Sequence, residues 1–361
     1  MRRDQGWLVD PVVRRQLAAV ERQLREVGCR GGRCPGFHRQ LLSPRSKRLR
    51  PALLLLAARF GNDTPHSVTI AAAAGLETLH EATLYHDDIV DEATLRRGQP
   101  SVHAGFGPVV AALAGSELLY GTPELFADLP VRLRRSIGRA IDALCRGQLR
   151  EIETLGDVTI GVRQRLRIMR DKTATLFGLA MRIGAALGGV DEGIAVRLVR
   201  FGMRFGLCFQ LADDLLDLQG THEAVGRVPH ADLRDGVYTL PVLYALEESS
   251  PVADLLRSYL LQLQGDAKTS LVEGAVALVR QAGGTARGVE TLRSWIASAE
   301  ADLEQIPGCT HRAAARSLRR LIRGLSYGAA NTNGERAGFA NTLPASTPGQ
   351  QAGKAPALGL V

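Results

Sequence analysis

The chain has 361 residues, of which 45% are hydrophobic, which is enough apolar material for one large core or for two domains. Its 45 Lys and Arg residues outnumber 37 Asp and Glu residues, and the net charge of +8 would attract phosphates or anionic lipid surfaces. Aromatic residues make up only 5% and do not interleave with the basic ones, so nucleic-acid binding gains little support.

Export and membrane insertion are not expected. No secretory signal is readable in the polar, charged start at residues 1–4, and the apolar run at 51–58 is too short to cross a bilayer. The five cysteines form no C-x-x-C pair and no zinc spacing with histidine. An odd cysteine count without a signal indicates reduced thiols, so we expect a cytoplasmic protein.

Helical periodicity dominates the chain, and no segment shows the sustained alternation of a strand. Asp10-Pro11 begins an amphipathic helix that extends to about Val27, followed by a loop rich in Gly, Cys and Pro at 28–36. A long apolar helix is predicted from Val68 to Val90. Further helices are predicted at about 108–120, 131–155, 161–188, 191–219, 239–248, 251–264, 268–283, 286–305 and 310–326, with a polar loop at 221–236.

Residues 328–361 are rich in Gly, Ala, Asn, Thr and Pro and have no periodicity. Such a segment cannot bury enough surface to order itself, so we predict a disordered tail. The preceding succession of helices with short connections predicts one all-α helical domain over residues 1–327.

Two copies of the pattern D-D-x-x-D are the most informative feature of the chain. The first aspartate motif consists of Asp87, Asp88 and Asp91, and the second of Asp213, Asp214 and Asp217. With 19 Asp in the chain, chance yields about 0.05 copies of the pattern and two copies about 0.001 times. A solvated helix face is the ordinary explanation of one copy, but the residues around both motifs are largely apolar.

The spacing of each motif predicts its chemistry. Asp87 and Asp91 are four residues apart, as are Asp213 and Asp217, so each pair lies on one face of a helix. Like charges at this spacing destabilise a helix unless a strong cation neutralises them. Carboxylate oxygens with room for water and phosphate suit Mg²⁺, so the two motifs together indicate a polyphosphate substrate.

The chain resembles the trans-isoprenyl diphosphate synthases, the head-to-tail prenyltransferases that build geranylgeranyl and longer polyprenyl diphosphates. The resemblance extends from about Ser46 to Ala245 and implies an all-α bundle of the isoprenoid synthase type around a central cavity. It rests on motifs in a fixed order: Lys47-Arg48-Leu49-Arg50-Pro51, His80 with the first aspartate motif, Arg96-Arg97-Gly98 with Pro100 and His103, Lys172-Thr173, Phe209-Gln210 with the second aspartate motif, Asp232-Leu233-Arg234-Asp235-Gly236, and Thr239-Leu240-Pro241.

The resemblance implies three Mg²⁺ ions held between the six motif aspartates, with the allylic diphosphate bound to them. Magnesium would stabilise the departing diphosphate as a Lewis acid, while the cavity shelters the carbocation from water. Thr173 and Gln210 would steady that cation through their dipoles. The proton lost in the last step would pass to the departing diphosphate, so no side-chain base is predicted.

A second phosphate pocket, without metal, is implied for isopentenyl diphosphate. Its predicted members are Lys47, Arg50, His80 and Arg97, and arginine suits this role because its guanidinium grips phosphate oxygens in pairs. A lone histidine on an apolar face is more often a core residue, but His80 lies seven residues before the first aspartate motif, on the same face.

Three further cations, Arg96, Lys172 and Arg227, are predicted to reach the allylic diphosphate. Members of the family usually carry Lys where Arg227 and Val237 stand. Arg227 keeps the positive charge and Val237 loses it, which would leave one cation fewer near the diphosphate.

Product length depends on the residues before the first aspartate motif, because in this family the growing tail runs down a tunnel beneath it. Ala82 and Thr83 lie five and four residues before Asp87 and are small, so the first turn is predicted to be open. Leu79, with Leu76, forms the next turn and is a candidate floor. We therefore predict products of twenty carbons or more.

Two alternatives remain open. A terpene cyclase on the same fold would not need the second phosphate pocket, so Lys47, Arg50 and Arg97 favour a synthase. A non-catalytic subunit of a heteromeric synthase would not need two complete aspartate motifs. The resemblance itself suggests a homodimer.

Overall fold

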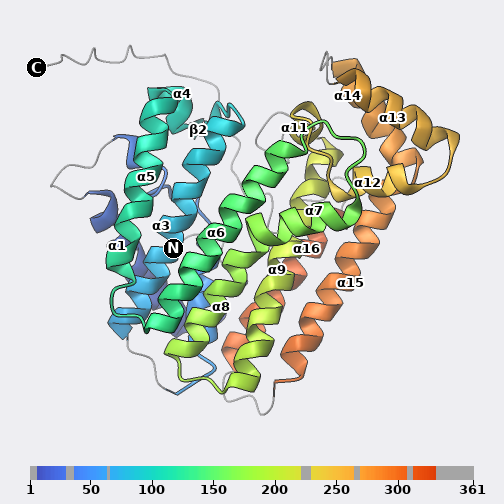
Figure 1. The fold of residues 1–361 in the computed structure, drawn as a ribbon. Coiled ribbons are helices and arrows are strands. Elements are labelled where there is room, and N and C mark those ends of the chain that lie inside the picture. Colours follow the sequence, from blue (N-terminus) through green and yellow to red (C-terminus); the bar gives the residue numbers. More distant parts are fainter. Residues whose placement is uncertain are drawn as a thin grey trace, which may run out of the picture.

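The computed structural model describes residues 6–29, 36–62, 66–220, 229–263, 269–306 and 312–330. Within these ranges the chain forms the predicted all-α bundle (Figure 1). The helices are α1 (Pro11–Gly28), α2 (Leu49–Ala58), α3 (His66–Val90), α4 (Val102–Phe106), α5 (Pro108–Leu125), α6 (Val131–Glu153), α7 (Val162–Met169), α8 (Thr175–Leu187), α9 (Glu192–Gln219), α11 (Ala231–Arg234), α12 (Leu240–Glu247), α13 (Pro251–Leu263), α14 (Thr269–Gln281), α15 (Gly284–Glu304) and α16 (Arg312–Ala330).

The long helices lie side by side around one hydrophobic core (Figure 1). Helix α3 packs along α5 and α1, α8 packs between α2 and α9, and α15 covers the other side of α9. Helix α2 is buried along its whole length except at Arg50, because almost every other residue in it is apolar. The buried positions of α3 likewise surround the helix, which places its polar residues inside the protein.

A second, smaller core joins α12, α13 and α14 to the end of α9. Figure 1 shows α13 and α14 as a pair at the upper right of the bundle. The amphipathic pattern of α13 points Leu256 and Leu260 into this core. These helices therefore pack against one side of the bundle that carries the motifs.

The predicted helices are confirmed wherever the structure describes them, and most of their boundaries agree within two residues. Helix α2 was not predicted. The absence of strands was wrong in one place: β1 (Leu95–Arg96) and β2 (Gln99–Pro100) form a short antiparallel hairpin after α3. The helix predicted at 161–188 is interrupted by a π-helical turn, η3 (Arg170–Ala174).

Two loop predictions also change. The short helix α11 lies within the predicted polar loop 221–236, of which 221–228 fall outside the described residues. Helix α16 extends to Ala330, so 328–330 are helical and the predicted tail cannot begin at 328. Residues 331–361 lie outside the described part. In the described residues, no helix is long and apolar enough to span a membrane.

Candidate active site

The two aspartate motifs lie at the C-terminal ends of two long helices, α3 and α9. Figure 1 shows that β2, which follows the first motif, and α11, which follows the second, are both at the upper end of the bundle. A negative side chain gains nothing from the macrodipole there, because a helix C-terminus is itself negative. The motifs therefore depend on cations from other elements.

The first aspartate motif is partly neutralised by two cations. Arg96 donates from Nε to Oδ1 of the buried Asp88 at 2.8 Å and also from Nη2, while Oδ2 of Asp88 is buried without a partner among the described residues. Burial raises the pKa of Asp87 to about 6; Lys172 opposes the increase and Asp91 adds to it. The motif thus retains carboxylate charge that the protein does not fully compensate.

In the second aspartate motif, Asp214 likewise has a carboxylate oxygen that no described residue pairs. Gln210 donates from Nε2 to its Oδ1 at 2.9 Å, and its buried Oδ2 has no partner in the described part of the chain. Burial raises the pKa of Asp214 to about 6, although Arg165 opposes the increase. Asp213 is exposed at the end of α9 and adds further negative charge.

Asp217 of the same motif has a visible structural contact. Its Oδ1 accepts from the backbone N–H of Ala231 and its Oδ2 from that of Asp232, both at 3.2 Å. These N–H groups begin α11, where a carboxylate is favourable. Asp217 therefore ties the segment after α9 to the site, and its predicted role as a metal ligand stays a prediction.

The π-helical turn η3 brings Lys172 and Thr173 to the site. An added Cβ at Gly147 of α6 would lie 2.6 Å from the backbone nitrogen of Lys172, and one at Gly206 of α9 would lie 2.5 Å from Cα of Ala174. Only glycine therefore lets α6 and α9 close on η3 from two sides. A single π turn inside a helix often marks a functional site, which agrees with the predicted roles of these two residues.

Thr173 and Gln210 form a chain of hydrogen bonds with the second aspartate motif. The hydroxyl of Thr173 donates to Oε1 of Gln210 at 2.9 Å, and the amide nitrogen of Gln210 donates to Asp214. Because a carboxylate can only accept, Asp214 fixes which end of the amide faces it. The carbonyl oxygen of Gln210 is thereby held beside Thr173.

Glu151 of α6 links the two motifs and was not predicted. It accepts from Lys172 at one oxygen and from the buried Arg165 at the other, the latter at 2.8 Å. Lys172 also interacts electrostatically with Asp87, and Arg165 with Asp214. Glu151 thus holds two cations, one directed to each aspartate motif.

The predicted cationic pocket combines residues from three elements. The guanidinium of Arg50 lies 4.3 Å from the centre of the Phe177 ring, and its Nε is buried without a partner among the described residues. Burial lowers the pKa of Arg50 to about 10, with a further lowering from Arg97. Burial lowers the pKa of His80 well below its usual value, and Arg50 and Arg97 add to this. Arg50, His80 and Arg97 are therefore close enough to affect one another electrostatically, as expected for members of one site.

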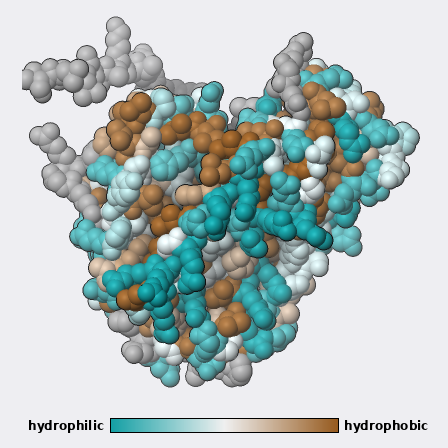
Figure 2. All heavy atoms as spheres, in the orientation of Figure 1, coloured by the Kyte–Doolittle hydropathy of each residue, from teal (hydrophilic) through white to brown (hydrophobic). Residues whose placement is uncertain are grey.

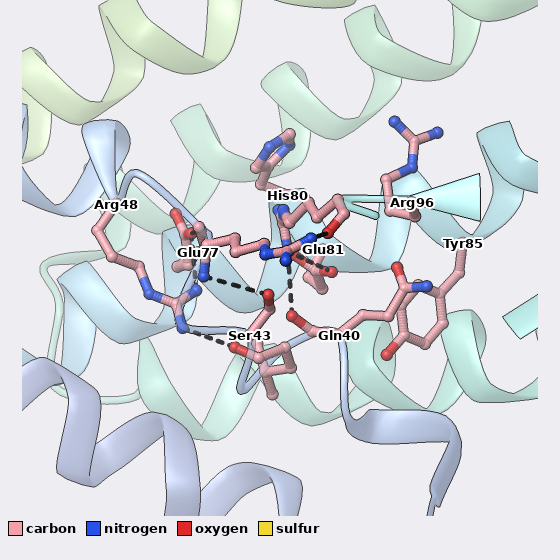
Figure 3. Close-up of polar contacts among 12 residues, drawn as sticks. Gln40, Ser43, Arg48, Glu77, His80, Glu81, Tyr85 and Arg96 are labelled. Carbon is pink, nitrogen blue, oxygen red and sulfur yellow. Dashed lines mark hydrogen bonds and ion pairs between the residues drawn. The ribbon is translucent and has the colours of Figure 1, made fainter. Parts of the chain in front are cut away.

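Lys47 precedes α2 and is half-buried, and it has an interaction within the protein. Figure 3 shows His80 and Arg96 directed to the same side of the view. Arg96 is paired with Asp88, so it belongs to the first aspartate motif, while Arg97 is part of the cationic pocket. The neighbouring arginines therefore pair with different carboxylates of α3, and their roles toward two different substrates stay predictions.

Two buried carboxylates of α3, Glu77 and Glu81, were missed from the sequence. Glu77 accepts from Arg48, whose Nε also donates to Glu21, and Glu81 accepts two hydrogen bonds from Arg97 (Figure 3). A glutamate in an apolar helical run has to be paired when buried, so the rule applied to the aspartates could have found both. Arg48, part of a recognised motif, is one of their structural partners.

The residues predicted to control product length lie on α3 below the first aspartate motif. Leu76, Leu79 and Ala82 are buried in the main core, and the hydroxyl of Thr83 donates to the carbonyl of His80 at 2.7 Å. Arg227 lies outside the described residues. Val237, at the other departure from the family pattern, donates its backbone N–H to the carbonyl of Asp232 at 2.7 Å.

The motifs suit Mg²⁺ in chemistry. Within the described ranges, no group of three or more His, Cys, Asp or Glu side chains forms a ready metal cage. Magnesium does not require one, since it keeps several waters and is usually held by one or two carboxylates with substrate phosphates. The unpartnered buried oxygens of Asp88 and Asp214 are the donors that such an ion could use.

Comparisons with known proteins show which family the chain is similar to. The polyprenyl synthetase family profile matches residues 35–279. The chain is 37% identical to a nonaprenyl diphosphate synthase of Mycobacterium tuberculosis over 279 residues, covering 77% of this chain and 82% of the relative. It is 39% identical to heptaprenyl diphosphate synthase component 2 of Geobacillus stearothermophilus over 234 residues, covering 64% of this chain and 73% of the relative.

A solved structure of similar shape is a polyprenyl synthase from Caulobacter crescentus in complex with calcium and isoprenyl diphosphate. It has a TM-score of 0.81 and 27% identity, covering 90% of this chain and 99% of that structure. The heptaprenyl diphosphate synthase of Staphylococcus aureus has a TM-score of 0.80 and 25% identity, covering 87% and 98%. Both similarities extend over the whole bundle.

The raised pKa of Asp87 predicts a metal-free protein that is less stable at neutral than at mildly acidic pH. A carboxyl whose folded pKa exceeds its unfolded value binds a proton more readily when folded, so the free energy of unfolding falls as pH rises from about 4 to 6. At pH 7.5 in chelator, the free energy of unfolding of the Asp87→Asn variant should therefore exceed that of the parent by about 1–3 kcal/mol, and the variant should melt at a higher temperature.

Thermal unfolding of both proteins at pH 5 and pH 7.5 checks this prediction. Asp128→Asn is the control, because Asp128 is exposed after α5. A lower melting temperature for Asp87→Asn than for the parent at pH 7.5 would show that Asp87 is well compensated in the metal-free protein.

Proposed function

The chain belongs to the polyprenyl synthetase family, and on this premise we propose that it joins isopentenyl diphosphate to an allylic diphosphate to make geranylgeranyl diphosphate or a longer polyprenyl diphosphate. As a member of this family it is a prenyltransferase. The family in general depends on magnesium. The residue roles, the number of ions, the product and the assembly are proposals.

One observation carries the proposal: the chain has two candidate diphosphate sites, one lined by carboxylates that would need a metal and one lined by cations. The acidic site has unpartnered carboxylate oxygens on Asp88 and Asp214, and the cationic pocket has the unpartnered Nε of Arg50. A reaction between two diphosphates, of which one ionises and the other does not, needs such a pair. A terpene cyclase on the same fold needs only the acidic site, so the cationic pocket favours a synthase.

The allylic diphosphate would bind between the aspartate motifs, through three Mg²⁺ ions. Bound magnesium would supply charge stabilisation to the departing diphosphate. Lys172 and Arg96, already oriented by Glu151 and Asp88, would contact the diphosphate oxygens directly, and Arg227 would add a third cation. Because these groups are held before substrate arrives, little reorganisation is needed as charge develops.

Loss of diphosphate leaves an allylic carbocation, and the chain has oxygens to face it. The carbonyl of Gln210 is fixed by Asp214 at its amide end and by Thr173 at its oxygen. Oε1 of Gln210 and the hydroxyl oxygen of Thr173 each keep a lone pair that could face a cation. Placing them on η3 and α9 beside apolar core residues would keep water from the cation.

Isopentenyl diphosphate would bind in the cationic pocket without metal. Arg50 and Arg97 would contact the phosphate oxygens together with Lys47. His80 would be neutral at pH 7, because its pKa lies well below its usual value, and would donate one ring N–H. Attack of the double bond on the cation and transfer of a proton to the departed diphosphate then complete one elongation.

A cytoplasmic location is part of this proposal, and cysteines that remain reduced thiols support it. Cys29, Cys145 and Cys208 are free in the structure, while Cys34 and Cys309 lie outside the described residues.

The central activity prediction concerns the aspartates. Purified protein with isopentenyl diphosphate, an allylic primer and Mg²⁺ should elongate the primer, and chelator should abolish the reaction. Asp87→Ala or Asp213→Ala should each lower kcat by at least about 100-fold, as expected when one preorganised charge stabiliser is lost. Asp128→Ala is the exposed control, and near-normal turnover of either motif variant would refute the assignment.

Product length tests the placement of the tail. Ala82 is almost fully buried below the first aspartate motif, and a phenyl ring there would occupy the proposed path. Ala82→Phe should therefore shorten the product, whereas Leu84→Phe, half-buried on the opposite side of α3, should not. Chromatography of the dephosphorylated products decides: a parent product of fifteen carbons, or an unchanged product from Ala82→Phe, contradicts the open path.

A homodimer is proposed, with α5 as its main contact. Val109, Leu113 and Tyr120 are 70%, 66% and 80% exposed and follow one face of α5, and Leu149 and Ile152 are exposed on α6. Figure 1 shows both helices on the face turned to the viewer, and Figure 2 shows brown hydrophobic atoms over the α5 side of it. Burial of such a face in a second copy would account for its composition.

Light scattering tests this assembly. The parent should be a dimer, and Leu113→Asp with Tyr120→Asp should be a monomer, while Leu255→Asp on α13 should remain a dimer. The relative named component 2 raises a heteromer as the alternative. A parent chain that is monomeric would exclude the homodimer, and one that also needs a second protein for activity would establish the heteromer.

A further inference from the structure

We propose that Glu81 is a positioning residue that presents one edge of the Arg97 guanidinium to the diphosphate of isopentenyl diphosphate. The proposal rests on the proposed function, because it assigns Arg97 to the cationic pocket. It adds a buried carboxylate to the predicted members Lys47, Arg50, His80 and Arg97, and it gives that carboxylate a specific task.

The backbone of Arg97 is already fixed by the hairpin between β1 and β2. Arg97 and Gly98 form its two-residue turn, with φ values of 54° and 71°, the left-handed region that such tight hairpins require. Arg45 donates to the carbonyl oxygen of Arg97 at 2.7 Å. These contacts place Cα of Arg97, but four side-chain torsions still separate it from the guanidinium. The guanidinium needs its own anchor.

Glu81 and Gln40 supply that anchor. Nη1 of Arg97 donates to the carbonyl oxygen of Gln40 at 3.0 Å and to Oε1 of Glu81 at 3.1 Å, and Nη2 donates to Oε2 of Glu81 at 3.0 Å. The Glu81 side chain has no exposed surface, and that of Arg97 is 18% exposed. The pair is therefore held within the protein while the arginine still reaches the pocket.

The contacts use three of the five N–H groups of Arg97 and leave a defined pair. A guanidinium carries one N–H on Nε and two on each terminal nitrogen. The Nε N–H and the second N–H of Nη2 lie along one edge, which matches two phosphate oxygens in the bidentate arrangement typical of arginine. Glu81 contacts the adjacent edge, between Nη1 and Nη2, and uses the other N–H of Nη2, so a diphosphate would not need to displace it.

Glu81 also balances charge where cations gather. Arg97 lowers the pKa of Arg50, and Glu81 raises it, so both groups act on the same guanidinium. Without Glu81, Arg97 would be pushed from its neighbours toward solvent and would lose the end-on contact that fixes its plane. Figure 3 shows Glu81 between Glu77 and Gln40, at the centre of the polar cluster. Its placement therefore suits orientation of the pocket.

The test uses Glu81→Gln, which keeps the shape of the side chain but removes its charge, and Glu81→Asp, which keeps the charge but shortens the reach. Calorimetric titration with isopentenyl diphosphate, in chelator and without primer, measures the pocket alone. Glu81→Gln should raise the Kd about tenfold, the loss expected when a charge-assisted contact is removed, and Glu81→Asp should fall between it and the parent. In elongation assays the KM for isopentenyl diphosphate should rise alike, with the KM for the primer within twofold of the parent.

A double-mutant cycle separates positioning from simple destabilisation. Once Arg97→Ala has removed the guanidinium, adding Glu81→Gln should change the Kd by less than twofold. The matched control is Asp302→Asn, which weakens the ion pair of the buried Asp302 on α15 with the half-buried Arg204 on α9. It should lower thermal stability without changing the Kd for isopentenyl diphosphate.

Each outcome decides. An unchanged Kd in Glu81→Gln, or additive effects in the cycle, would overturn the positioning role. A lower Kd would show that Glu81 competes with the diphosphate for Arg97, and would overturn it as well. A parent protein that elongates no primer would refute the proposed function instead, whatever the Glu81 variants do.

Discussion

Pairing of buried carboxylates is the constraint on which the rest of the structure depends. Helix α3 carries the buried Glu77, Glu81 and Asp88 and the half-buried Asp87, and an unpaired buried charge would cost far more free energy than the protein can spare. The cation that neutralises each carboxylate comes from another element: Arg48 from the start of α2, Arg96 and Arg97 from the hairpin, and Lys172 from η3. The positions of these three elements follow from the charges of one helix.

The same constraint separates the two halves of the site. The glutamates are matched by Arg48 and Arg97, while burial, with a smaller contribution from Arg97, lowers the pKa values of Arg50 and His80. The aspartates lie about two turns beyond Glu81, and burial, with Asp91 adding to it, raises the pKa of Asp87 against the opposing effect of Lys172. In the proposed function, one helix would thereby contribute to a site for a bare diphosphate beside a site for a metal-bound diphosphate.

The sequence predicted those features that depend on local pattern. The i, i+4 aspartates, the apolar course of α3 and the order of the motifs follow from spacing alone. Contacts across the bundle could not be predicted from the sequence, because they join segments that are far apart in the chain. Examples are the ion pair of Glu151 with Lys172, the close approach of Gly147 to η3 and the contact of Asp217 with α11. The hairpin was missed because two-residue strands have no periodicity to detect.

The most direct test of the central claim, that the aspartate motifs bind a diphosphate only through magnesium, is calorimetric titration with an unreactive thiolodiphosphate analogue of an allylic substrate. Binding should be strong in excess Mg²⁺ and undetectable in chelator, because the uncompensated carboxylates of Asp87 and Asp214 would repel the bare anion. Equal affinity in both conditions would contradict this claim and would place the allylic diphosphate on the cations instead.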